Sequence, residues 1–271
     1  MDLGRFGIWV LASDVSANAA RVIESLGFGA LWVGGSPTGK LAEVQAALDA
    51  TESMVVATGI VNMWRDEATG AAAAYHQIQG RHPDRFLLGV GIGHPEATAE
   101  YRNPSATIVG YLDELDAAGV PRDHIVLAAL GPRVLELAAA RTAGAHPYLT
   151  TPRHTKMART VIGDGPLLAP EQTVVVSDDR AEAQRFAGDF LARYLRLVNI
   201  RSNLLREGWS EDDLAGGGSD RLRDELILTG DATVAAGIEA HLDAGADHVA
   251  IQALGPHPEG AYRALAAVLY D

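Results

Sequence analysis

The sequence predicts a single (β/α)8 TIM barrel with a helical insertion between its seventh and eighth strands. Two observations support this fold: strand-like and helical patterns alternate along the whole chain, and the alternation gives eight strands. The length of 271 residues agrees, because such a barrel typically takes roughly 250 residues as one domain. We therefore expect one α/β domain over residues 1–271.

Short apolar runs mark the strands. Two of them, 55–62 (VVATGIVN) and 85–94 (RFLLGVGIGH), are largely apolar on both faces, which is typical of parallel strands covered on both sides. The carboxyl ends of the strands of such a barrel share one face, where ligands bind. In chain order, the predicted strands span 5–11, 30–34, 54–61, 86–92, 125–130, 145–149, 172–176 and 248–254.

Helical periodicity appears between the strands, with glycine or proline at several helix ends. Gly27 ends the first helix, and Pro132 begins the fifth directly after Gly131. The predicted helices span 16–26, 40–50, 68–80, 106–118, 132–142, a segment that begins near 152, 231–244 and 259–270.

The segment 177–225 is too long for one crossover helix and is expected to be a helical insertion. Apolar residues recur at helical spacing over 179–206, and glycines at 216–218 end the pattern. An apolar stripe of this kind must be covered by the barrel wall or by a partner. We expect a subunit interface rather than a part of the active site, formed by Phe186, Phe190, Tyr194, Leu197 and Leu204.

Composition excludes several classes of protein. The chain has no cysteine, which excludes disulfides, zinc–thiolate sites and iron–sulfur clusters, and no metal-binding motif is present. A net charge of −13 argues against nucleic-acid binding, which needs a basic face. No signal peptide and no apolar run long enough for a membrane helix is seen, so we expect a cytoplasmic protein.

Glycines and polar residues gather at the predicted ends of the third and fourth strands. Gly59-Ile60 interrupts the third strand shortly before Asn62, which indicates a bulge or a close backbone approach, although simple packing fits equally well. Gly93 and His94 end the fourth strand, where a ligand can approach the backbone and a histidine can move a proton. A loop histidine packed near a helix start is the alternative.

The segment Leu130-Gly131-Pro132-Arg133 follows the fifth strand directly. A helix that begins at a proline after a glycine presents its positive dipole end, and Arg133 adds a full charge. The motif therefore favours an anion such as phosphate, although an ordinary strand-to-helix turn has the same pattern.

Large aromatic residues lie at or after several strand ends and can line a flat apolar pocket. The candidates for a substrate pocket are Trp9, Trp32, Trp64 and Tyr148, although a large aromatic taken singly is more often a core or rim residue than a ligand contact. The remaining histidines outside the strand ends are expected to be structural, among them His82, His124, His241 and His248.

These motifs resemble those of the luciferase-like monooxygenase superfamily, in its coenzyme F420 (deazaflavin)-dependent oxidoreductase branch. The later motifs look like those of an uncharacterised actinobacterial-type subfamily. The match keeps its order over nearly the whole chain, and its segments are 57–62 (ATGIVN), 85–94 (RFLLGVGIGH), 127–133 (LAALGPR), 144–148 (GAHPY), 168–172 (LAPEQ) and 244–248 (AGADH).

The resemblance implies a TIM barrel that transfers a hydride between F420 and a small organic substrate. It also implies a bulge at Gly59-Ile60, often with a non-proline cis peptide, behind the central ring of the deazaflavin. His94 or His146 would be the proton donor, and members are commonly homodimers. The cofactor-binding residues implied are Gly59, Ile60, Asn62, Gly93, His94, Leu130, Gly131, Pro132 and Arg133.

One segment departs from the pattern of that branch. Members that oxidise sugar phosphates or alcohols carry an acidic–histidine pair after the second strand, where this chain reads Val33-Gly34-Gly35-Ser36. Alcohol oxidation by that mechanism is therefore not expected, whereas reduction of an activated double bond or imine asks less of the protein because the cofactor carries the hydride chemistry.

Two other functions remain open. One is a flavin mononucleotide (FMN) monooxygenase of the same fold that works with a separate reductase. The other is a cofactor-free barrel that binds a ligand, which the missing acidic–histidine pair makes possible. Retention and titration of the two cofactors would separate the three hypotheses.

Overall fold

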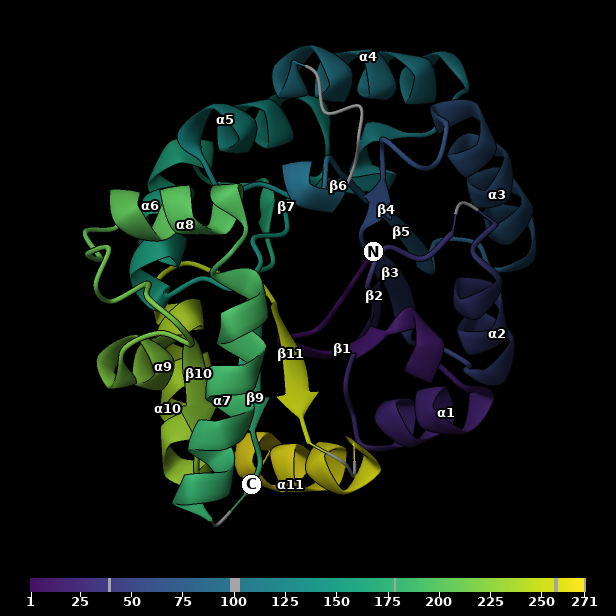
Figure 1. The fold of residues 1–271 in the computed structure, drawn as a ribbon. Helices are drawn as coiled ribbons and strands as arrows, with labels where there is room; N and C mark the ends of the chain where they lie inside the picture. Colours follow the sequence, from purple (N-terminus) through teal and green to yellow (C-terminus); the bar gives the residue numbers. More distant parts are fainter. Residues whose placement is uncertain (39, 98–102, 178, 256–257, 271) are drawn as a thin grey trace.

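Parallel strands form the centre of the molecule and helices surround them (Figure 1). The computed structural model describes residues 1–38, 40–97, 103–177, 179–255 and 258–270. Within these residues the neighbouring strands are β1 (Phe6–Leu11), β2 (Ala30–Gly34), β3 (Val55–Gly59), β5 (Phe86–Gly91), β6 (Ile125–Leu127), β7 (Gly144–Ala145) and β8 (Leu167–Leu168). On the other side of β1 follow β11 (Val249–Leu254), β9 (Glu171–Val175) and β10 (Ile227–Thr229), and β4 (Val61–Asn62) pairs with β5.

The segment from β8 to β9 closes the sheet into a barrel. Only Ala169 and Pro170 separate these two strands, β8 pairs with β7, and β9 pairs with β11. Backbone bonds continue on both sides of the junction, from Ala169 N–H to the Ala145 carbonyl and from Ala250 N–H to the Pro170 carbonyl. The predicted TIM barrel is confirmed.

Helices cover the outer face of the barrel, as Figure 1 shows. Those that follow the strands are α1 (Ala17–Ser25), α2 (Ala42–Ala50), α3 (Ala68–Arg81), α4 (Pro104–Ala117), α5 (Pro132–Arg141), α6 (Pro152–Ile162), α10 (Asp231–Asp243) and α11 (Pro258–Tyr270). The insertion contributes α7 (Arg180–Tyr194), α8 (Val198–Arg206) and α9 (Asp220–Leu226). In the described residues no helix is both long and apolar enough to cross a membrane.

Side chains alternate between the barrel interior and the helix layer, as strand geometry requires. On β1, Ile8 and Val10 pack outward in the main core, while Trp9 packs inward. The inward cluster is completed by Leu3, Ala30, Trp32, Val55, Ala57, Leu87, Val126, Ala169 and Ala250. Its upper boundary is the floor of the cavity described below.

Several predicted elements differ from the structure, among them the fifth strand, which ends at Leu127 instead of 130, and three of the differences have local reasons. The third strand divides into β3 and β4 around Ile60. The sixth strand ends at Ala145 instead of 149, because Pro147 has no N–H for the ladder and Leu149 has a left-handed φ of 54°. The single helical pattern over 179–206 is broken between Tyr194 and Val198.

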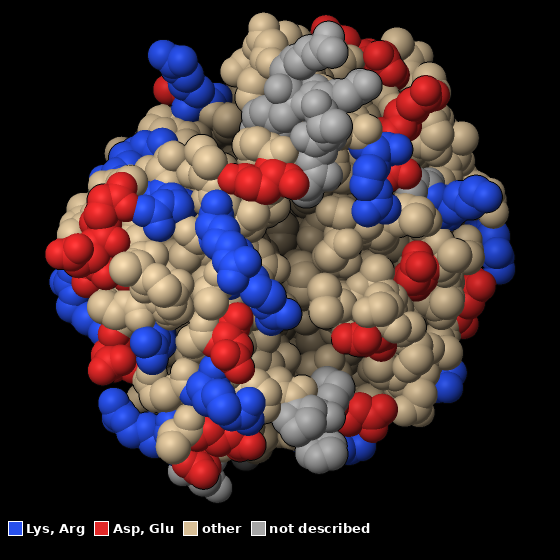
Figure 2. Space-filling view, in the orientation of Figure 1, with Lys and Arg blue, Asp and Glu red and all other residues tan. Residues whose placement is uncertain are grey.

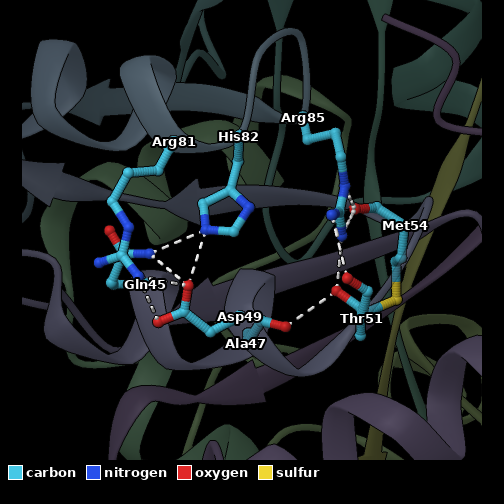
Figure 3. Close-up of polar contacts among 8 residues, drawn as sticks. All are labelled: Gln45, Ala47, Asp49, Thr51, Met54, Arg81, His82 and Arg85. Atoms are coloured by element: carbon cyan, nitrogen blue, oxygen red, sulfur yellow. Dashed lines mark hydrogen bonds and ion pairs between the residues drawn. The ribbon is translucent and has the colours of Figure 1, made fainter.

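The starts of β3 and β5 are joined by the side chain of Arg85 (Figure 3). Its guanidinium donates to the carbonyls of Thr51 and Met54 at 3.0–3.2 Å. Nearby, Asp49 of α2 receives hydrogen bonds from His82 and Arg81 at the end of α3, at 2.8 and 3.0 Å. These contacts hold the amino ends of the strands, far from their glycine-rich carboxyl ends, and His82 is structural as predicted.

Candidate active site

A cavity of about 760 Å³ opens at the carboxyl ends of the barrel strands. Figure 2 shows the hollow at the centre of the face drawn in Figure 1, with Lys or Arg side chains along the edge where α7 and α8 lie. Its volume is in the range of pockets that hold a drug-sized ligand or a cofactor. The position agrees with the face where ligands bind in barrels of this type.

Ten of the predicted site residues line this cavity: Trp9, Gly59, Ile60, Asn62, Gly93, His94, Leu130, Gly131, His146 and Tyr148. The structure therefore brings together segments from β1, β3, β5, β6 and β7 that are distant in sequence. Four predicted residues do not line it, namely Trp32, Trp64, Pro132 and Arg133.

Two of these four have a clear structural position. Trp32 lies fully buried inside the barrel, where its Nε1 donates to Nε2 of His248 at 3.0 Å. Arg133 lies on the first turn of α5 with its side chain exposed to solvent. Trp32 was selected by residue type and position near a strand end, and Arg133 by the helix start and the resemblance, and none of these signals fixes the direction of a side chain.

The bulge predicted at the end of the third strand is present. The Gly59-Ile60 peptide is cis, β3 ends at Gly59, and β4 begins at Val61. The Ile60 side chain lines the cavity and lies against Gly91, where an added Cβ would come within 3.1 Å of it. Small residues on β5 thus leave space for Ile60 to face the cavity.

The insertion forms one wall of the cavity, contrary to the expectation of an interface away from the active site. Phe190, Arg193 and Tyr194 of α7 line it, together with Arg206 of α8. Phe190 and Leu204 are buried within the chain itself, in a cluster that includes Leu149 and Val175. The apolar stripe therefore packs in part within this chain itself, with Phe186, Tyr194 and Leu197 half-buried against the same cluster. Sequence periodicity could not distinguish this packing from contact with a partner subunit.

Hydrogen bonds join the amino end of α8 to the loop after β5. The ring of His94 contacts Oδ1 of Asn199 through Nδ1 at 2.6 Å, and Oε1 of Glu96 accepts from the backbone N–H of Val198 at 2.9 Å. Because an amide oxygen only accepts, Nδ1 of His94 carries the proton. His94 thus positions the insertion as well as lining the cavity.

Arg206, rather than the predicted Arg133, lies beside the start of α5 in the cavity. Gly131 caps α5, and Arg206 lies near it, with guanidinium nitrogens 3.8 and 3.9 Å from the position of an added Cβ at Gly131. Nη1 of Arg206 donates to Oδ1 of Asn203 at 3.0 Å. The Leu130 carbonyl before this turn contacts Nε2 of His154 at 2.8 Å, which fixes the turn. A helix start beside a guanidinium favours phosphate.

The cavity wall is positively charged although the protein is acidic. Arg193 and Arg206 line it, and in the described part of the chain neither has a carboxylate within ion-pair distance. No Asp or Glu is found among the described lining residues. In a chain with a net charge of −13, two unpaired guanidiniums in one cavity favour an anionic ligand.

A second polar region lies deeper, around His146. Its Nδ1 contacts the Ala169 carbonyl at 2.6 Å, and its ring stacks on Trp32 with 4.1 Å between centroids. Burial lowers the pKa of His146 to about 4, so the ring is neutral near pH 7. Nε2 of His146 and Nε1 of Trp9 are both buried without a hydrogen-bond partner in the described residues. Unpaired buried groups cost about 1–3 kcal/mol each, which marks this region for a polar ligand.

Next to it, three side chains form a chain of hydrogen bonds. The Tyr148 hydroxyl lies 2.8 Å from Oε1 of Gln252 and 2.9 Å from the Tyr194 hydroxyl. Since an amide oxygen only accepts, Tyr148 donates to Gln252 and Tyr194 donates to Tyr148. Burial raises the pKa of both tyrosines, and it also raises that of the nearby Glu171 to about 7.

The structure explains why the segment after β2 has glycines in place of an acidic–histidine pair. A Cβ added at Gly34 would overlap the indole of Trp9, so the Trp9 ring occupies the space of a side chain at position 34. Gly35 and Ser36 line the cavity beside it. The polar functions of this region therefore come from β1 and from the residues after β7 rather than from the segment after β2.

Sequence reasoning missed several residues of the site. Arg193, Tyr194, Asn199 and Arg206 belong to the insertion, and Gln252 belongs to β11. A buried glutamine on an otherwise apolar strand was the one available signal for Gln252, whereas the helical residues carry no local motif.

The fold is similar to that of several solved oxidoreductases. An F420-dependent secondary alcohol dehydrogenase, solved with an F420–acetone adduct, aligns with a TM-score of 0.78 at 16% identity over 98% of both chains. The coenzyme F420-dependent tetrahydromethanopterin reductase from Methanopyrus kandleri aligns with a TM-score of 0.70 at 16% identity, over 98% of both chains. The oxygenating constituent of 3,6-diketocamphane monooxygenase from Pseudomonas putida, solved with FMN, aligns with a TM-score of 0.71 at 15% identity, over 97% of this chain and 96% of that one.

These similarities establish the fold. No model of a known protein family matches the sequence, and no curated protein sequence matches it. The three structures include proteins solved with F420 or named for it and one solved with FMN, so the fold accommodates either cofactor.

Proposed function

We propose that this protein is an oxidoreductase that binds coenzyme F420 in the cavity and acts on a small organic substrate. The proposal rests on two polar regions that belong to the same cavity. Arg206 lies unpaired beside the start of α5, and the partnerless nitrogens of Trp9 and His146 lie deeper in the barrel. A phosphate-bearing cofactor fits the first region and a polar substrate group fits the second.

The second unpaired guanidinium favours F420 over FMN. FMN has one phosphate, which the start of α5 and Arg206 can hold. The deazaflavin carries carboxylates in addition to its phosphate, and Arg193 is available on the same wall for an anionic group. FMN remains the second candidate because the monooxygenase constituent solved with FMN shares the fold.

The residues of this chain have separable roles in the proposal. When bound, the deazaflavin would supply a two-electron hydride donor or acceptor. Ile60 packs against the ligand, Arg206 binds its phosphate, and the aromatic rings of Trp9 and Tyr148 exclude water from the substrate. His146 holds its proton on Nδ1 and presents a lone pair at Nε2, so near pH 7 it accepts a hydrogen bond or a proton. The predicted role of proton donor would require a buried imidazolium.

Equilibrium titrations with F420 and with FMN, followed by the fluorescence of each cofactor, test the proposal. We expect saturable one-to-one binding of F420, with an affinity at least about tenfold above that for FMN, a difference of about 1.4 kcal/mol. Tighter binding of FMN would favour the monooxygenase hypothesis. Absence of binding for both would favour a cofactor-free barrel.

A further inference from the structure

The guanidinium of Arg206 is held by a buried amide. Its Nη1 donates to Oδ1 of Asn203 at 3.0 Å, about one turn earlier on α8. Asn203 has only 2% of its surface exposed, whereas Arg206 extends to the cavity beside Gly131. A long, exposed arginine side chain samples many rotamers, so a hydrogen bond to a fixed group restricts where its charge lies.

A carboxyl group fixes the orientation of that amide. Nδ2 of Asn203 donates to Oε1 of Glu207 at 2.7 Å, and the Glu207 side chain is only 7% exposed. A guanidinium only donates hydrogen bonds, and a carboxylate oxygen accepts them. The Asn203 amide therefore has one arrangement that satisfies both neighbours, with its oxygen toward Arg206 and its nitrogen toward Glu207.

Glu207 is in turn bound to the helix that contacts the turn before α5. Its Oε2 accepts from Oγ1 of Thr151 at 2.8 Å, and Thr151 is the N-cap of α6. The same helix carries His154, whose Nε2 contacts the Leu130 carbonyl at 2.8 Å. Because α6 contacts both Glu207 and this turn, it fixes the position of Arg206 relative to the start of α5.

The distance of the carboxylate matters for the charge of Arg206. A carboxylate in direct contact would form an ion pair and cancel much of the attraction of the guanidinium for an anion. In this chain the neutral amide of Asn203 lies between Arg206 and Glu207. Among the described residues, no carboxylate lies within ion-pair distance of Arg206.

We propose that Asn203 is a positioning residue that holds the Arg206 guanidinium at the start of α5 for a phosphate group, and that Glu207 orients the Asn203 amide without neutralising Arg206. A fixed and uncompensated charge suits phosphate, which a helix start also favours. That the phosphate belongs to a cofactor rests on the proposed function, whereas the positioning of Arg206 needs only this chain.

The first test measures the order of the Arg206 side chain by ¹⁵N relaxation at Nε, without any ligand. Asn203→Leu keeps the branched shape of the side chain but removes both of its hydrogen bonds. We expect the Nε order parameter of Arg206 to lie above about 0.6 in the unmodified chain and below it in Asn203→Leu. Arg193 is the matched control, because it lines the same cavity from α7, over the ring of Phe190, and its order parameter should not change. Arg206→Lys and Arg193→Lys identify the two signals.

The second test is a titration with inorganic phosphate, followed at the backbone amide of Gly131. Asn203→Leu should weaken phosphate binding by about fivefold, because the guanidinium is no longer held beside the helix start. In the Arg206→Ala background the same substitution should change the affinity by less than about twofold, since an effect that acts through Arg206 disappears with it. A general loss of structure would instead lower the affinity equally in both backgrounds.

An exchange of the two side-chain types tests the role of the neutral amide. The double variant with Asn203→Asp and Glu207→Gln retains a donor and an acceptor between the two positions but brings the carboxylate into contact with Arg206. We expect Arg206 to stay ordered, while phosphate affinity falls at least about fivefold below that of the unmodified chain. Circular dichroism checks that each variant is folded. If Asn203→Leu does not fold, an unchanged phosphate affinity in the double variant would still contradict the proposal.

The positioning role would be overturned by an Arg206 order parameter, or a phosphate affinity, that is the same in the unmodified chain and in Asn203→Leu. No shift of Gly131 with phosphate would overturn phosphate as the ligand. A parallel F420 titration separates these results from the proposed function. Binding of F420 with an unchanged Arg206 removes only the positioning role, whereas a loss of phosphate binding in Asn203→Leu in a chain that does not bind F420 removes only the proposed function.

Discussion

His146 and His248 lie in the same barrel interior but face its opposite ends. Both are almost fully buried, at 2% and 1% exposure, and burial lowers the pKa of each to about 4. Both also contact a backbone carbonyl through Nδ1, that of Ala169 at 2.6 Å and that of Gly4 at 2.8 Å. They differ at Nε2: in His248 it accepts from Trp32, and in His146, a residue that lines the cavity, it is buried with no partner in the described residues.

The comparison shows that burial and a shifted pKa do not identify a functional histidine by themselves. A residue whose hydrogen bonds are complete in the folded chain contributes to stability, and one that is left with an unpaired group facing a cavity is available to a ligand. The same distinction separates the arginines near α5. Both side chains are exposed, but Arg206 lines the cavity without a carboxylate, while Arg133, which the sequence favoured, does not line it.

The largest expected effect concerns these two arginines. Arg206→Ala should weaken F420 binding by about 1.5–3 kcal/mol, the range for hydrogen bonds to charged groups. Arg133→Ala, at the same end of α5 but outside the cavity lining, should change the affinity by less than about twofold. Fluorescence titration of both variants measures the difference. Equal losses in the two variants would show that α8 does not supply the cation.

The next effect concerns the two histidines. His248→Asn leaves the indole N–H of Trp32 unpaired, whereas His146→Asn removes an acceptor that has no partner in the folded chain. The free energy of unfolding should therefore fall by about 1–3 kcal/mol more in His248→Asn than in His146→Asn. Urea unfolding of the two variants checks this. If His146→Asn were the more destabilised protein, Nε2 of His146 would have a structural partner.

A smaller effect is expected at the outer end of the tyrosine chain. Tyr194→Phe removes the donor to Tyr148 but leaves the bond from Tyr148 to Gln252. The loss of one neutral hydrogen bond should cost about 0.5–1.5 kcal/mol of unfolding free energy. Tyr148→Phe breaks both bonds and should cost more, so a larger loss in Tyr194→Phe would contradict the assigned direction of the chain.

The smallest expected effect is the pH dependence of the His146 ring between pH 8 and about 5.5. The pKa of His146 lies below its ordinary value of 6.5, at about 4, so Nε2 keeps its lone pair over this range and loses it only as the pH falls through about 4. The ¹⁵N shifts of the His146 ring should therefore be constant from pH 8 to 5.5. A step in these shifts centred near 6.5 would mean that His146 titrates as an exposed histidine.

Glu171 also titrates in this range and is the control for that experiment. Burial raises its pKa from 4.5 to about 7, and it lies near Tyr148. A step in the His146 shifts near pH 7 that disappears in Glu171→Gln belongs to Glu171, while a step that persists in the variant belongs to another group.

The sequence allowed the barrel to be predicted because its signals are local. Apolar runs, glycines at strand ends and a proline at a helix start determine β3, β5 and α5 within a few residues. The bulge at Gly59-Ile60 and the participation of Trp9, His94, His146 and Tyr148 in the cavity followed from the same local reasoning, together with the resemblance.

The rest of the site depends on contacts between distant segments. Arg206 reaches Gly131, and Asn199 reaches His94, across many residues of intervening chain. No helical pattern in the insertion distinguishes a wall of the cavity from a subunit interface, because both need an apolar stripe. The expectation of a homodimer stays a prediction, and the stripe once assigned to it is used within the chain.

A crystal structure of the protein with bound F420 tests the central claim most directly. The account predicts the phosphate within hydrogen-bond distance of Arg206 at the start of α5, the ring against Ile60, and open space between that ring and the nitrogens of Trp9 and His146. Binding of the phosphate at Arg133 or outside the cavity, or a ring that covers Nε2 of His146 and leaves no space for a substrate, would contradict it.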